Sequence, residues 1–572
     1  MKKIFFSAML ILSLSPISSE ERLSLIWPVD RPVQLSGSFA EFRGSRFHHG
    51  IDIGCDGEKG FRVFASAAGS VAEVIYQNYG IGYCVVLRHS GGFTTLYGHL
   101  ESFAQKILDN PKIKAHQTDI DDHCDFRVNL SDGEIPVTQG ETIAYTGNSG
   151  IGPEHLHFEL ADSSDNPVNP LRMGLPVPDY LPPVIERIYL IPLDGSSTIN
   201  GSSDTYEIPT VKIKGKRVLK SNDAVRIAGR IGVMIDAYDL SGGKNHIGIY
   251  RGIVSHNGTR QKIFSFDRIK SEESRQCALL YDIADSTFSR YRYFLYNRAT
   301  GEGIVNVTNG PDSQTIDVIA ADASDNECAY SLSVVRDREP QQPLWKRDIN
   351  TRSGKSSAIA SSDKKCTIEI PQGGTIYDES ISVTEDQLID HSPKGIVPLS
   401  RAYKTQPADL CAVKPFQVVF PIDEKESTHT GIYSIGRNGV IRAEYSWYDK
   451  KRHALIASAW KLSSFFVARD EAPPVVRSPK RILIKGEIFI RVSDTGSGID
   501  PRSVRILVDG KPVKFYHDPD QQSFIILPHN VIWDDGDHII TASISDCAGN
   551  RSDELVVHYE TRPGMKFAKI IR

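Results

Sequence analysis

Beyond its first residues, the sequence contains no long hydrophobic run. After the run at residues 4–15, no stretch approaches the roughly 18 apolar residues that a membrane-spanning helix needs. That run follows the basic Met1-Lys2-Lys3 and precedes small residues ending at Ser19, a pattern that predicts a signal peptide over residues 1–19. No cysteine stands at the predicted cleavage point, which argues against a lipid anchor. We therefore expect an exported protein without a transmembrane segment, located in the periplasm or at the cell surface or outside the cell.

The chain also lacks a strong excess of either charge. Its 66 Lys and Arg residues and 71 Asp and Glu residues leave a formal net charge of −5, which is small for 572 residues. Proteins that hold polyanions through their overall charge carry a clear positive excess. The composition therefore argues against a nucleic-acid partner.

Cysteine is scarce, with eight residues in the chain. In an exported protein such residues can form disulfides. Their positions favour two bridges, Cys277 with Cys328 and Cys366 with Cys411, although spacing alone does not determine connectivity.

Two short motifs bring together residue types that bind metals. His48 and Asp52 flank a glycine, and His155 and His157 lie two apart in a strand-like run, so both of these side chains leave the same face. Catalytic zinc sites use three nitrogen or carboxylate ligands and leave a fourth position open for water. Two such half-sites predict a zinc site, with one histidine of the second motif on the metal and the other handling protons beside it.

The motifs also resemble a known family. H-x-G-x-D at His48 to Asp52, Tyr97-Gly98-His99-Leu100 and H-L-H-F-E from His155 make residues 27–172 similar to the lysostaphin-type, LytM-like zinc metallopeptidases. That family cuts peptide cross-links in bacterial cell walls. The resemblance implies that the zinc ligands are His48, Asp52 and His157. It further implies that His99 and His155 are catalytic histidines that do not bind the metal.

Glycine-separated runs of β-branched and aromatic residues predict an antiparallel β fold for this first domain, residues 20–178. Glu159 would share a strand face with His157, where it either orients that ligand or lies at the surface. The chain departs from the family pattern at an insertion, residues 106–125. We expect a polar loop there, acting as a lid or substrate-selecting wall, because long loops inside compact domains are usually functional. A second metal site in this loop is the less favoured alternative.

The remaining chain predicts a mainly β fold with three β-sandwich-like domains. An internal repeat, seen in Asp179-Tyr180-Leu181-Pro182-Pro183 and Asp470-Glu471-Ala472-Pro473-Pro474, marks two of them. The second copy resembles bacterial Ig-like domains, and the first does so more weakly. The expected order is an Ig-like domain at 179–337, a linker at 338–365, a β-rich domain at 366–469, an Ig-like domain at 470–560 and a basic tail at 561–572.

Together these features predict an exported zinc endopeptidase that hydrolyses peptide cross-links of peptidoglycan. We expect the first domain to cut small peptides without the others, which would bind the wall or a cell-envelope protein partner. Two alternatives remain open. One is a non-catalytic activator of another wall hydrolase, and the other is an adhesin or structural surface protein.

Overall fold

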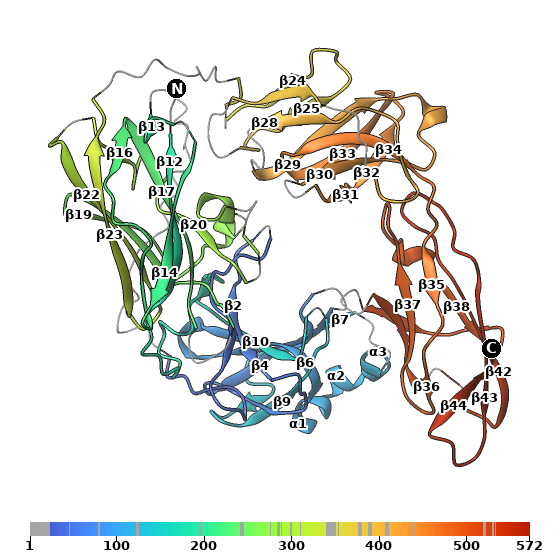
Figure 1. Ribbon diagram of the computed structural model, residues 1–572. Helices are drawn as coiled ribbons and strands as arrows, with labels where there is room; N and C mark the ends of the chain where they lie inside the picture. The colour runs from blue at the N-terminus through green and yellow to red at the C-terminus, as the bar shows by residue number, and fades with distance from the viewer. Residues whose placement is uncertain are drawn as a thin grey trace, which may run out of the picture. The chain divides into compact units, whose positions relative to one another are not determined.

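The computed structural model describes residues 23–571, apart from residues 339–349 and shorter internal stretches that include 122–124 and 241–244. The predicted signal peptide lies outside the described residues. Strands dominate the described elements, and the predicted mainly β class is confirmed (Figure 1). Among the described residues, no helix combines the length and the apolar character needed to cross a membrane.

The chain divides into two compact units. Residues 1–116 and 126–347 belong to the first unit, and the remaining residues to the second. An 11-stranded sheet and one pair of six-stranded sheets occupy the first unit, and two further pairs of sheets occupy the second.

The 11-stranded sheet forms the first domain. Its strands are β1 Leu35–Gly37, β2 Gly50–Gly54, β3 Arg62–Phe64, β4 Gly69–Gln77, β5 Gly82–Arg88, β6 Thr94–Phe103, β7 Phe126–Asn129, β8 Pro136–Val137, β9 Thr142–Thr146, β10 His155–Ala161 and β11 Pro167–Val168. The main path runs β1-β2-β10-β6-β5-β4-β7, so β10 lies between β2 and β6 (Figure 1). Each of these neighbouring pairs is antiparallel, as predicted. Fully buried Val71, Val74, Val85 and Leu87 pack β4 and β5 into the core.

The insertion at residues 106–125 differs from the expected polar loop. It contains three short helices, α1 Gln105–Leu108, α2 Pro111–Lys114 and α3 Gln117–Asp121, while residues 122–124 lie outside the described residues. Ile107 and Ile113 are buried, and the Asn110 side chain caps α2 by accepting a hydrogen bond from the Lys112 N–H at 3.0 Å. The loop prediction was wrong because apolar anchors and a helix cap organise this segment locally.

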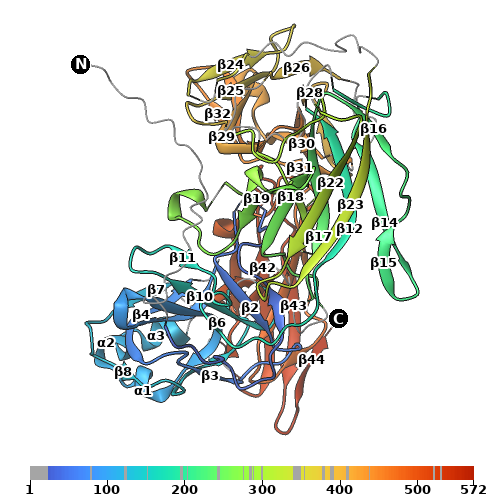
Figure 2. The ribbon, with the colours of Figure 1, turned by 90° about the vertical axis from the view of Figure 1, so that its left-hand side faces the viewer.

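The second domain pairs two six-stranded sheets, which lie as layers in Figures 1 and 2. One contains β12 Val184–Pro192, β14 Tyr206–Ile213, β15 Lys216–Leu219, β17 Arg230–Tyr238, β20 Arg292–Phe294 and β21 Val305–Asn306. The other contains β13 Thr198–Ile199, β16 Val225–Ala228, β18 Arg251–His256, β19 Thr259–Ser265, β22 Ser313–Ala321 and β23 Glu327–Arg336.

The first and second domains are joined by many contacts within the same unit. The side-chain amide of Asn169 donates to the carbonyl oxygen of Phe266 at 2.9 Å, and Val168 forms an isolated β-bridge with Arg268. The Arg172 guanidinium donates to the Ala323 carbonyl oxygen at 2.8 Å. The end of the first domain is therefore built into the second.

The second unit contains two further sandwich-like pairs of sheets. The first pair joins β24 Ser357–Ala360, β25 Thr367–Ile370, β29 Cys411–Pro421, β32 Ser446–Asp449 and β33 Ala454–Lys461 with β26 Ser382–Glu385, β27 Ile396–Pro398, β28 Tyr403–Gln406, β30 Thr430–Ile435, β31 Ile441–Ala443 and β34 Ser464–Asp470. The last pair joins β35 Val475–Arg477, β37 Ile488–Ser493, β40 Phe515–Asp518 and β41 Ser523–Ile526 with β36 Ile482–Leu483, β38 Arg505–Val508, β39 Lys511–Pro512, β42 Gly536–Ser543, β43 Leu555–Thr561 and β44 Phe567–Ile571. In each pair, residues of both sheets share one apolar core.

Two segments that we expected to lie outside the β domains, the linker and the basic tail, each contain a strand of such a domain. Part of the expected linker forms β24, which pairs with β25, and residues 339–349 of that linker lie outside the described residues. The expected basic tail supplies β44, which pairs with β36 and β43. Ala568 is buried between exposed Phe567 and Lys569, as in a strand with one face on the core.

Both predicted disulfides are wrong. Cys328 and Cys366 are free thiols, so neither the bridge to Cys277 nor the bridge to Cys411 exists. Cys366 is fully buried in the core of its domain, where burial raises the pKa of its thiol and the residue packs as a small apolar side chain.

Candidate metal centre

Strand pairing brings the two predicted half-sites together. Strands β2 and β10 are antiparallel neighbours, and their register places Asp52 directly opposite His157. His48 lies just before β2 and turns back over the same face. On the other side of β10, the register places Gly98 opposite His157, so that His99 follows immediately on β6.

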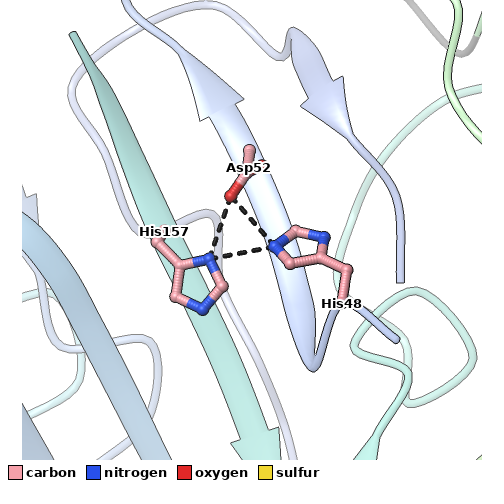
Figure 3. Close-up of side chains that lie close together, drawn as sticks. All are labelled: His48, Asp52 and His157. Carbon is pink, nitrogen blue, oxygen red and sulfur yellow. Dashed lines mark hydrogen bonds and ion pairs between the residues drawn. The ribbon is translucent and has the colours of Figure 1, made fainter. Parts of the chain in front are cut away.

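The side chains of His48, Asp52 and His157 point at one another (Figure 3). His157 Nδ1 lies 2.9 Å from Asp52 Oδ1 and 3.1 Å from His48 Nε2, and His48 Nε2 lies 3.2 Å from the same carboxylate oxygen. All three residues are buried. Two nitrogens and one oxygen thus form a nearly equilateral triangle.

The outer partners of the two histidines determine which ring atoms face inward with a lone pair. His48 Nδ1 donates to the Ser38 carbonyl oxygen at 2.8 Å, because that oxygen can only accept. His157 Nε2 donates in the same way to Glu159 Oε1 at 2.8 Å. The neutral tautomers therefore aim two nitrogen lone pairs and one carboxylate oxygen at a common point, and such a point requires a positive charge.

A proton or a metal ion could supply that charge. Burial opposes the charged form of His157, but its hydrogen bonds to Asp52 and Glu159 outweigh burial and raise its pKa to about 9. Burial lowers the pKa of His48 to about 4. Although burial disfavours its charged form too, the nearby histidines hold the pKa of Asp52 well below its usual range. A metal ion bound here would displace one proton from His157, as is usual for histidine sites.

The donor set fits zinc. Zinc–nitrogen bonds of about 2.0–2.1 Å in a tetrahedral site separate two ligand atoms by roughly 3.3 Å. The three separations of 2.9, 3.1 and 3.2 Å lie just below that value. Glu159 adds the carboxylate that commonly orients a metal-binding histidine from behind. These three residues could therefore hold a metal ion without rearrangement of the sheet.

The other two predicted site residues lie beside the triangle. His99 Nδ1 donates to the Ser149 carbonyl oxygen at 2.9 Å, and His155 Nδ1 donates to the Pro153 carbonyl oxygen at 2.6 Å. Their rings are 4.5 Å apart between centroids, and His155 Nε2 is 3.6 Å from Asp52 Oδ1. Both rings therefore keep Nε2 as a proton acceptor next to the candidate metal centre.

His99 is also strained. Its φ of 58° lies in the left-handed region, which costs a non-glycine residue about 1–3 kcal/mol. Its N–H donates to the Ile81 carbonyl oxygen at 2.8 Å, which helps to hold this conformation. Burial, followed by the neighbouring histidines, lowers the pKa of His99 to about 3. Strain of this kind is common where side-chain placement serves function.

The structure adds two charged residues that the sequence analysis missed. Arg43 Nη2 lies 2.5 Å from Asp52 Oδ2, on the side of the carboxylate that faces away from His157, and 3.2 Å from Glu41 Oε2. Burial raises the pKa of Glu41 to about 7. The only signal in the sequence is a Glu-x-Arg pair close to His48, which resembles an ordinary surface charge pair.

Comparison with known proteins assigns the first domain. Residues 46–118, which include His48, Asp52 and His99, match the sequence profile of peptidase family M23. The chain carries a family M23 peptidase domain. The match ends before His155 and His157, so the second half-site rests on the geometry described above.

Relatives of the M23 domain support a peptidase. An uncharacterized metalloprotease of Haemophilus influenzae is 35% identical over 158 residues, covering 26% of this chain and 27% of its own. The DD-carboxypeptidase/endopeptidase Mpg of Neisseria meningitidis serogroup B is 34% identical over 136 residues, covering 23% of this chain and 24% of its own. The chain thus matches about a quarter of the length of these curated relatives.

One solved structure similar to the M23 domain is the catalytic domain of the prophage-encoded M23 protein EnpA from Enterococcus faecalis. It is 22% identical, with a TM-score of 0.18, over 24% of this chain and 89% of that domain. This similarity is too low to bear on function.

Proposed function

We propose that this protein is an exported zinc-dependent endopeptidase that hydrolyses peptide cross-links of bacterial peptidoglycan. The observation that carries the proposal is the triangle of His48, Asp52 and His157, whose inward-facing lone pairs require a cation. The M23 domain supports peptide hydrolysis. The signal peptide predicted over residues 1–19 supports export, to the periplasm, the cell surface or outside the cell.

His48, Asp52 and His157 would hold the zinc ion. When bound, zinc acts as a Lewis acid and makes water more acidic. Glu159 and the Ser38 carbonyl oxygen fix the tautomers of the two histidine ligands. Hydrogen bonds within the protein therefore orient the two histidine ligands before a metal ion binds.

His99 and His155 would move protons. Each donates from Nδ1 to a backbone carbonyl oxygen, which leaves Nε2 as the basic atom at the site. One ring would accept a proton from water at Nε2 and later give this proton to the leaving amine. The other ring, protonated at Nε2, would donate a hydrogen bond to the oxygen of the scissile group. The two histidines make nearly equivalent hydrogen bonds, so kinetic measurements on their variants must assign which ring plays which role.

The reaction class can be tested on purified cell wall. Amide hydrolysis should release new free amino groups and no new reducing sugar ends. The zinc chelator 1,10-phenanthroline should abolish this release, and added zinc should restore it. New reducing ends without amino groups would instead indicate a glycosidase and would exclude the proposed peptidase activity.

A further inference from the structure

The segment that carries His48 is held in place from the second domain. The Gly248 N–H donates to Glu41 Oε1 at 3.0 Å, and Ser38 Oγ donates to the Gly248 carbonyl oxygen at 3.0 Å. The Tyr281 hydroxyl donates to the Ala40 carbonyl oxygen at 2.9 Å. Three hydrogen bonds between the two domains therefore fix a short loop of the first domain.

The same contact continues to the residues on both sides of His48. The Phe47 N–H donates to the Ser274 carbonyl oxygen at 2.9 Å, and His49 Nε2 lies 2.6 Å from Ser274 Oγ. The buried Phe47 ring packs against Phe266 and Tyr281, at centroid distances of 5.9 and 6.1 Å. His49 thus points to the second domain, while His48 points to the candidate metal centre.

Glu41 links this contact to the candidate ligands. Its side chain is fully buried, and Oε1 accepts hydrogen bonds from the Ser38 and Gly248 N–H groups at 2.7 and 3.0 Å. Oε2 faces Arg43, which in turn contacts Asp52 Oδ2. The Ser38 carbonyl oxygen accepts the proton of His48 Nδ1. One carboxylate therefore organises the outer partners of two of the three candidate ligands.

We propose that Glu41 and Arg43 are positioning residues for the metal centre, and that the second domain completes this centre through the backbone of Gly248. Arg43 fixes the rotation of the Asp52 carboxylate so that Oδ1 faces the two histidines. Glu41 holds both Arg43 and the Ser38 carbonyl oxygen, and Gly248 holds Glu41. This proposal differs from the expectation that residues 20–178 act alone, because an outer partner of the centre comes from the second domain.

Glycine at position 248 fits this role. A Cβ at this position would lie 3.0 Å from Glu41 Cγ, 3.0 Å from Ser38 Oγ and 3.1 Å from the Tyr293 hydroxyl oxygen. Such distances are tighter than ordinary van der Waals contacts, so Gly248→Ala must displace Glu41 or its neighbours. This substitution perturbs the candidate metal centre from the second domain and leaves every residue of the first domain unchanged.

The test uses the full-length chain and measures zinc affinity by chelator competition, with the visible spectrum of the cobalt-substituted protein as a readout of ligand geometry. Glu41→Gln and Gly248→Ala should each weaken zinc binding by about 10–100-fold, the usual effect of losing an outer partner of a metal ligand. Both should also change the cobalt spectrum. Arg43→Lys, which keeps a positive charge beside Asp52, should weaken zinc binding less than Arg43→Met.

Two matched controls separate positioning from general damage. Glu73→Gln removes a carboxylate that is paired with Arg127 at 2.5 Å in the same domain. Gly354→Ala adds a methyl group where nothing lies within 4 Å. Both should keep wild-type zinc affinity and the wild-type cobalt spectrum.

This inference rests on the proposed zinc site, and the outcomes keep the two apart. If the wild-type protein binds no zinc, the proposed function fails. If the wild-type protein binds zinc and the folded Glu41→Gln and Gly248→Ala variants bind it equally well, only the positioning role is overturned. Loss of cooperative thermal unfolding in both variants also overturns it, because a purely structural contact predicts that result.

Discussion

Glu159 offers a quantitative test of how the candidate metal centre is organised. Its carboxylate accepts the Nε2 proton of His157 at 2.8 Å, which turns Nδ1 toward Asp52 and His48. Glu159→Ala removes this acceptor, so that His157 can take the wrong tautomer or rotate away. Outer carboxylate partners of metal ligands typically contribute about 10–100-fold in affinity, or about 1.4–2.7 kcal/mol.

Zinc affinity measured by chelator competition should fall by this amount in Glu159→Ala. Glu159→Gln keeps an acceptor oxygen but loses the negative charge, so its affinity should lie between those of wild type and Glu159→Ala. Glu73→Gln, at an ion pair in the same domain, is the control and should bind zinc normally. Wild-type affinity in a folded Glu159→Ala variant would refute the tautomer argument.

Two further predictions concern catalysis and stability. His99→Ala and His155→Ala should keep zinc but lose hydrolysis of a cross-linked wall peptide by about 10²–10⁴-fold; wild-type turnover in either variant would remove that residue from the mechanism. In the second domain, burial opposes the charged form of Asp236, but hydrogen bonds from Arg292 and Arg290 outweigh it and lower the pKa of Asp236. Because the pKa of Asp236 is lowered in the folded protein, its ionised carboxylate stabilises the fold at pH values above the ordinary aspartate pKa. This stabilisation is lost as the pH falls through the folded-state pKa. Asp236→Asn should therefore destabilise the protein by about 3–5 kcal/mol at pH 7 and flatten its acid denaturation; an unchanged melting temperature at pH 7 would contradict this.

The two half-sites could be predicted because each is a local motif, whereas the choice of His157 over His155 as a ligand came from the family resemblance. His48 and Asp52 are four residues apart, and the alternation of His155 and His157 follows from the period of a strand. Strand order could not be deduced in the same way. That β10 lies between β2 and β6, which brings His99 beside His157, is a consequence of the folded sheet.

The outer partners could not be predicted because their contacts join distant parts of the chain. Gly248 meets Glu41 across 207 positions, and no local pattern marks either residue. The α2 helix, in contrast, carried a readable signal. Asn110 before Pro111 is a favourable pairing of N-cap and first helical residue. The polar composition of the segment had favoured a loop instead. The free thiols at Cys328 and Cys366 show that sequence spacing does not suffice to predict a bridge.

The most direct test of the zinc site is the metal content of the purified full-length protein and three variants. We predict about one zinc ion per wild-type chain and strong loss of zinc in His48→Ala, Asp52→Ala and His157→Ala. Inductively coupled plasma mass spectrometry on protein dialysed against metal-free buffer gives this number. Full zinc retention in any two of the three variants would contradict the assignment of the site.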